Sequence, residues 1–127
     1  MKANVISWFE IIASNFDRAV TFYEKILGLP AKSMHRMEFA GGMMAFFPHE
    51  QGKGVGGAIW KDDGHSKPSE QGTRVYLDVE GEMEAVLSRV ASAGGKIIKP
   101  RTNIDPHGFI AAIHDSEGNI VGLHSMT

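Results

Sequence analysis

The sequence of 127 residues is long enough for one compact domain that holds its own hydrophobic core. Its formal net charge of −2 gives no basic footprint for nucleic acid, and no apolar run approaches the roughly 20 residues that cross a bilayer. The chain has no cysteine, which excludes disulfides and thiolate catalysis. Because Glu10 also interrupts the N-terminal apolar run, we expect no export signal and a cytoplasmic protein that contacts neither nucleic acid nor membrane.

The first half of the chain predicts a strand, a helix and three shorter strands. Residues 5–13 are apolar and typical of a strand. Ser14 has the chemistry of a helix N-cap, and the apolar stripe after it recurs at helical spacing as far as Gly28, which marks the end of a helix. Glycine turns then separate three short segments with strand character: residues 31–39, 43–47 and 55–60.

The second half predicts the same order of elements after a polar connector at residues 61–72. Residues 74–80 alternate apolar and polar side chains, and the helical stripe that follows ends at Gly94 and Gly95. A strand at residues 96–99 is expected to stop at Pro100. Two further strands complete the pattern: residues 108–114 and 120–125.

This repetition predicts an α+β fold of two βαβββ modules in a single domain, residues 1–127. Module one covers about residues 1–60, the linker 61–72 and module two 73–127. The two helices overlay at one constant difference in residue number between the modules. The first strands overlay at a difference that is one residue smaller, which indicates a one-residue difference in length at the strand–helix joint. The alternative is a generic α+β sandwich without duplication, but the helix stripes and glycine stops recur together, which favours duplication.

Several motifs carry a family resemblance. Residues 8–11, 16–19 and 22–28 resemble the first module of the vicinal-oxygen-chelate superfamily, which includes glyoxalase I, bleomycin resistance proteins and extradiol dioxygenases. Residues 115–119, before the last strand, agree with it, and residues 45–48 resemble its small bacterial glyoxalase-like branch. The resemblance implies a curved mixed sheet around a concave cavity, helices outside, and a homodimer.

The resemblance also implies a divalent metal, held by side chains from the first and last strands of each module. Those positions fall on Trp8, Arg74, Gly122 and either Gly56 or Gly57. An indole donates only a hydrogen bond, a guanidinium is a fixed cation and glycine has no side chain, so none can coordinate a metal. We therefore expect no cofactor at the usual place. A divalent metal held elsewhere stays open, with Glu10 and one of three histidines as ligands: His35, His114 or His124.

Strand alternation predicts which side chains line the cavity. If Phe9 and Ile11 face the helix, then Trp8 and Glu10 face the cavity, and the same reasoning applies in the second module. The predicted catalytic residues are Glu10 and His124, and the predicted ligand-binding residues are Trp8, Arg74, Tyr76 and Asp78. Aromatic surface with a few polar groups is typical of a small-molecule pocket.

Each of these side chains also has a structural interpretation. Trp8 is as compatible with the core as with a pocket, and Tyr76 is compatible with packing alone. Glu10 and Arg74 begin equivalent strands and are compatible with a buried ion pair across the module junction. Asp78 is compatible with a solvated strand end, and His124 with a surface histidine near the C-terminus.

Three functions remain in consideration. The first is binding of a small molecule, anionic or carbonyl-bearing, in the sheet concavity without the family metal, either for sequestration or for acid–base chemistry. The second is a metal-dependent lyase or isomerase with ligands in non-standard places. The third is a dimeric protein without a small ligand that acts as a regulator or interaction partner.

Overall fold

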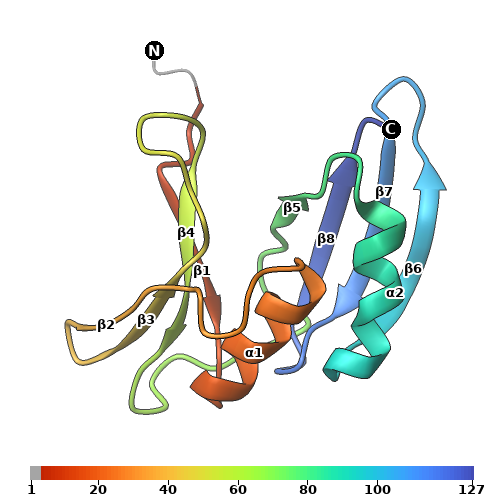
Figure 1. Ribbon diagram of the computed structural model, residues 1–127. Coiled ribbons are helices and arrows are strands. Elements are labelled where there is room, and N and C mark those ends of the chain that lie inside the picture. Colours follow the sequence, from red (N-terminus) through yellow and green to blue (C-terminus); the bar gives the residue numbers. More distant parts are fainter. Residues whose placement is uncertain (1–3) are drawn as a thin grey trace.

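Two successive β-α-β-β-β modules form the fold of residues 4–127 in the computed structural model (Figure 1). This confirms the predicted α+β class and the predicted order of elements. In chain order the elements are β1 (Trp8–Ile12), α1 (Phe16–Ile26), β2 (Arg36–Phe39), β3 (Gly42–Phe46), β4 (Gly56–Lys61), β5 (Tyr76–Asp78), α2 (Met83–Ala93), β6 (Lys96–Asn103), β7 (Phe109–His114) and β8 (Ile120–Ser125).

The strands form two four-stranded mixed sheets with the same internal order, β1-β4-β3-β2 and β5-β8-β7-β6. In each sheet the first strand of the module pairs in parallel with the last strand, and the remaining pairs are antiparallel. The sequence predicted one curved sheet, whereas the strand pairs of residues 4–127 stay within a module. Both β1 and β5 are therefore edge strands, and the two sheets rise on either side of a gap (Figure 1).

Equivalent hydrogen bonds define how the modules overlay. The backbone N–H of Ala13 donates to the carbonyl of Trp60, and that of Val79 donates to the carbonyl of His124. Ala13 precedes the N-cap of α1 by two residues, and Val79 precedes that of α2 by three. The predicted one-residue difference at this joint is thus confirmed. In the same overlay, Gly122 of module two is equivalent to Ala58 of module one. This corrects the predicted equivalence of Gly122 to Gly56 or Gly57.

The start of α1 differs from the prediction by one residue. Asn15 is the N-cap, and its side chain accepts a hydrogen bond of 3.0 Å from the N–H of Arg18. Ser14 was the expected cap, but its hydroxyl and N–H both donate to the Glu117 carboxylate, 103 positions further along the chain. The predicted stop at Gly28 is confirmed, because this residue adopts a φ of 69° directly after the end of the helix.

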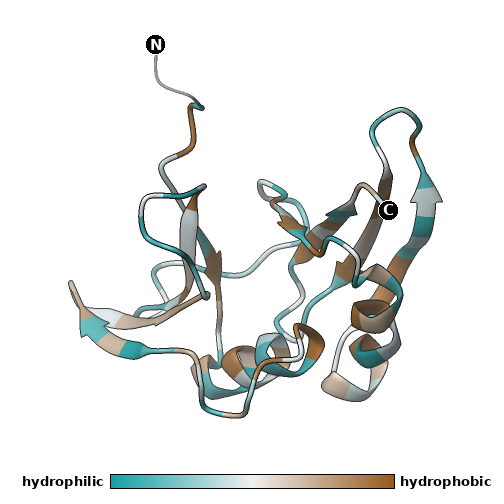
Figure 2. Ribbon diagram, turned by 45° about the horizontal axis from the view of Figure 1, so that its top comes forward, coloured by the Kyte–Doolittle hydropathy of each residue, from teal (hydrophilic) through white to brown (hydrophobic). Residues whose placement is uncertain are grey.

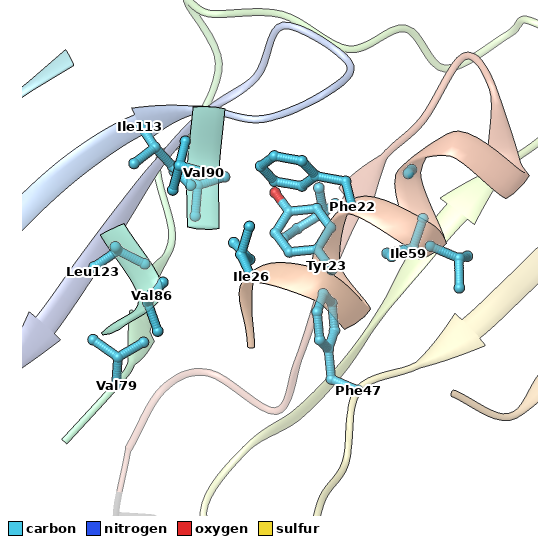
Figure 3. Packing of buried hydrophobic residues seen from close by; sticks show 14 of the residues in the cluster. Phe22, Tyr23, Ile26, Phe47, Ile59, Val79, Val86, Val90, Ile113 and Leu123 are labelled. Carbon is cyan, nitrogen blue, oxygen red and sulfur yellow. The ribbon is translucent and has the colours of Figure 1, made fainter. Parts of the chain in front are cut away.

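One hydrophobic core joins the two modules. The helices α1 and α2 pack against each other, and each also packs on its own sheet. Figure 2 shows both helices with alternating hydrophobic and hydrophilic residues, as expected for helices that bury one side. Residues from both helices and both sheets meet in the close view of Figure 3, which labels Phe22, Tyr23, Ile26, Phe47, Ile59, Val79, Val86, Val90, Ile113 and Leu123. Neither helix of residues 4–127 is long and apolar enough to span a membrane.

The strand β6 is longer than predicted. It continues through Pro100 to Asn103, so the expected stop after Lys99 is wrong. The strand lies at the edge of its sheet, and its register against β7 shifts between Lys99 and Thr102. Proline lacks a backbone N–H, and an edge strand with an irregular register tolerates that loss.

Candidate functional site

A cleft of about 950 Å³ separates the edges of β1 and β5. This volume lies within the usual range for small-molecule sites, roughly 300–1,000 Å³. Module one contributes β1, the end of α1, the segment after β3 and the start of β4, and module two contributes β5 with the residues before it. The lining residues are Ile6, Trp8, Phe9, Glu10, Leu27, Leu29, Phe47, Pro48, Val55, Gly56, Gly57 and Thr73 to Asp78.

Two aromatic rings stand on opposite walls of the cleft. Trp8 is 41% exposed on β1, and Tyr76 is 48% exposed on β5. Each ring lies over a glycine of the neighbouring strand. Trp8 pairs with Gly56 and Tyr76 with Gly122, and a Cβ added at these glycines would lie 3.1 and 2.3 Å from the respective rings. The missing glycine side chains therefore leave the space that the rings occupy.

Polar groups accompany the rings. The Trp8 indole Nε1 donates a hydrogen bond of 3.2 Å to Glu10 Oε2, and Asp78 Oδ1 accepts one of 3.0 Å from the backbone N–H of Glu80. Arg74 is exposed and makes no ion pair with another residue in the described range 4–127. Glu10 is exposed as well, so the buried Glu10–Arg74 pair considered from the sequence is wrong. Arg74 therefore contributes a cation to the lining of the cleft.

The structure does not bring His124 into the cleft. His124 lies on β8, which pairs with β5, and it is the direct pairing partner of Asp78. The two side chains therefore lie on the same face of the sheet, as strand alternation predicted. However, β5 lies between β8 and the cleft, and the His124 ring contacts the carbonyl of His107 at 2.8 Å from Nε2. The cleft thus contains five of the six predicted site residues, and the prediction that His124 shares their surroundings is wrong.

The apolar base of the cleft was missed from the sequence. Leu27 and Leu29 flank Gly28 directly after α1, and Phe47 and Pro48 follow β3. Strand alternation gives no information on residues that follow the end of an element, so none of the four was predicted. The helix stop at Gly28 was a usable signal, because both of its neighbours line the cleft.

A clasp of hydrogen bonds joins the start of α1 in module one to the turn before β8 in module two. Glu117, in the turn before β8, accepts hydrogen bonds from the N–H groups of Ser14 and Asn15 and from the Arg18 guanidinium, at 2.7–2.9 Å for the closest contacts. Burial alone would raise the pKa of Glu117, but these bonds outweigh it and lower the pKa to about 2. The carboxylate is therefore ionised at neutral pH and holds the start of α1 to module two.

A second buried contact supports the clasp. The Tyr23 hydroxyl on α1 donates a hydrogen bond of 2.7 Å to Asp115 Oδ2, and both groups are buried. Burial and the adjacent Asp115 carboxylate raise the pKa of Tyr23 well above its ordinary value. Asn119 completes the arrangement by donating to Asp115 Oδ2 and to the carbonyl of Ile12 at the end of β1.

The residues at the superfamily's usual metal positions do not fit a metal ion. Trp8 offers an indole N–H that already donates to Glu10, and Arg74 offers a cation. Ala58 and Gly122 at the equivalent places of β4 and β8 have no donor atom. Among residues 4–127, no three histidine, aspartate or glutamate side chains gather closely enough to hold a metal.

Paired βαβββ modules with a ligand-sized cleft between them define the class of protein. The model of the Glyoxalase/Bleomycin resistance protein/Dioxygenase superfamily matches residues 5–123, and the chain belongs to this superfamily. Proteins described as "Putative glyoxylase CFP32" from Mycobacterium bovis and Mycobacterium tuberculosis are 28% identical over 126 residues. These alignments cover 96% of this chain but 44% of each relative, so the chain spans under half the length of these relatives.

Solved structures agree on the fold. A glyoxylase/bleomycin resistance protein/dioxygenase domain from Frankia sp. EAN1pec superposes with a TM-score of 0.72 at 18% identity, and the match covers 98% of each chain. The fosfomycin resistance protein FosX from Listeria monocytogenes superposes with a TM-score of 0.64 at 15% identity, covering 100% of this chain and 94% of that chain. The solved structures thus agree with the fold, and the match of the family model confirms the family resemblance seen in the sequence.

Proposed function

We propose that the protein binds a small anionic or carbonyl-bearing molecule in the cleft between β1 and β5, without the metal that the superfamily usually employs. The exposed Arg74 guanidinium carries this proposal, because it faces the cleft with no carboxylate partner in the described range 4–127. A guanidinium presents several N–H donors in a planar fork that matches a carboxylate or phosphate. Membership of the superfamily supports small-molecule binding as the general activity.

The other predicted residues receive roles that follow from their positions. The Tyr76 hydroxyl is a second donor near Arg74, and Trp8 supplies a flat apolar wall. Asp78 lines the same wall as Tyr76 and repels a misplaced anion. Glu10 is the one predicted catalytic residue within the cleft, and its exposed carboxylate is the group we assign as general base if the bound molecule is processed. His124 is left out of this assignment because its ring bonds to His107.

Replacement of Arg74 tests the proposal. We expect Arg74→Met to weaken the binding of carboxylate probes such as benzoate and 2-naphthoate by about 1–3 kcal/mol, the value of a charge-assisted hydrogen bond. The thermal midpoint should stay within a degree or two, because Arg74 is exposed and makes no ion pair within residues 4–127. Affinity is measured by titration calorimetry and stability by thermal unfolding.

The control variant is Lys99→Met, which removes an exposed cation from β6, outside the cleft. It should leave carboxylate affinity unchanged. If Arg74→Met and Lys99→Met have equal affinities, Arg74 does not hold the ligand and the proposal fails. A large loss of stability in Arg74→Met with unchanged affinity would instead show that the residue serves packing.

We also propose a homodimer. Each sheet has two open edges, and the outer strands β2 and β6 expose large apolar side chains. These are Met37, Phe39, Ile97 and Ile98. Unpaired edges that carry apolar residues are usually covered in stable proteins, and a second copy of the chain supplies a symmetric cover.

A further inference from the structure

The two exposed rings of the cleft do not belong to the buried hydrophobic core. Trp8 and Tyr76 come from different modules, and each ring lies close to a glycine on the adjacent strand. An aromatic ring of a packed core is normally covered on both faces, whereas these rings are 41% and 48% exposed and both line the same cleft. The cleft therefore offers an exposed aromatic surface on each of its two walls.

The charge of the cleft adds a second requirement. Arg74 lies two residues before Tyr76, just ahead of the start of β5, and its side chain lines the same cleft as the ring. Apart from Glu10 and Asp78, the remaining lining is largely apolar, including Leu27, Leu29 and Phe47. A ligand that satisfies both features has a planar unsaturated ring system and one negative group at its rim.

We propose that the cleft selects planar aromatic anions, with the ring system against Trp8 and Tyr76 and the anionic group at Arg74. This inference rests on the proposed function, because it specifies the ligand class of the same cleft. It goes further by predicting discrimination against saturated molecules of equal size and charge. Stacking on two rings should favour the aromatic molecule about tenfold, since each well-placed aromatic pair contributes beyond its buried area.

The test compares 2-naphthoate with decahydro-2-naphthoate, which has the same carbon skeleton and carboxylate but no planar ring. The measured quantity is the ratio of their dissociation constants by calorimetry, expected to be about tenfold in the unmodified protein. Tyr76→Leu should lower the ratio to about threefold, and Tyr76→Phe should preserve it because the ring remains. Phe39→Leu is the matched control, since Phe39 is exposed on β2 outside the cleft and the ratio should not change.

A spectroscopic measurement locates the bound ring. The chain has two tryptophans, Trp8 in the cleft and Trp60 on β4, whose indole donates to Asp62. Ring currents of 2-naphthoate should shift the indole N–H resonance of Trp8 and leave that of Trp60 in place. Shifts of Trp60 alone would place the ligand elsewhere and overturn the inference.

The outcomes separate the inference from the proposed function. If both acids bind equally and both lose affinity in Arg74→Met, the selection for aromatic molecules is wrong while anion binding in the cleft stands. If neither acid binds and neither indole resonance shifts, both proposals fail. A tenfold ratio that survives Arg74→Met, falls in Tyr76→Leu and persists in Phe39→Leu supports the inference.

Discussion

Removal of the Glu117 charge tests the clasp between the modules. In Glu117→Gln the side chain keeps its shape but loses its negative charge. Its amide oxygen can still accept from Ser14 and Asn15, whereas its amide NH2 cannot accept the bond that Arg18 Nε donates to Glu117 Oε2. The drop of the pKa from an ordinary 4.5 to about 2 corresponds to at most about 3.4 kcal/mol. The Glu117 side chain is fully buried, but Arg18 is 52% exposed, so solvent screening reduces the expected loss to about 2 kcal/mol at pH 7.

The pH dependence gives a second readout of the same interaction. A carboxyl group with a lowered pKa in the folded protein stabilises the fold above its ordinary pKa of 4.5, and this contribution is lost as the pH falls toward 2. Urea unfolding of the unmodified protein should therefore show a loss of stability between about pH 4.5 and pH 2. Glu117→Gln should lose about 2 kcal/mol less over the same interval, because it has no proton to take up there.

The control for this experiment is Glu38→Gln, which removes an exposed charge from β2 that has no hydrogen bond or ion pair of its side chain within residues 4–127. Its stability should match that of the unmodified protein within about 0.5 kcal/mol at each pH. The reasoning is refuted if Glu117→Gln is as stable as Glu38→Gln at pH 7. It is equally refuted if both variants lose the same stability in acid.

Three further predictions concern packing, metal and assembly. Gly57→Ala should destabilise the fold by about 1–3 kcal/mol in urea unfolding, because the added Cβ would lie 2.1 Å from the Phe9 ring; Gly72→Ala, with nothing within 4 Å, should be near neutral. Metal analysis after purification without chelator should find less than one Zn, Ni, Fe or Mn per chain, and one tightly bound metal lost in a Glu10 variant would contradict this. Light scattering at micromolar concentration should give the mass of a dimer, and a stable monomer would contradict the proposed assembly.

The sequence by itself determined the elements and their order. The apolar stripe of α1, the stop at Gly28 and the alternation along β1 depend on backbone periods of 3.6 and 2 residues within one element. The recurrence of this pattern then predicted two modules, and the resemblance of their motifs pointed to the superfamily. Alternation also identified Trp8, Glu10, Arg74, Tyr76 and Asp78 as neighbours on the helix-free faces, and these side chains do line one cleft.

The tertiary structure decided where the cleft lies and which groups it omits. The cleft follows the edges of β1 and β5, so His124 on the next strand is excluded although its alternation was right. Ser14 donates to Glu117, 103 positions away, instead of capping α1. Pro100 is tolerated within β6 because β6 is an edge strand. These outcomes depend on how separate elements dock, and docking is set by contacts between distant residues that no local period of the sequence encodes.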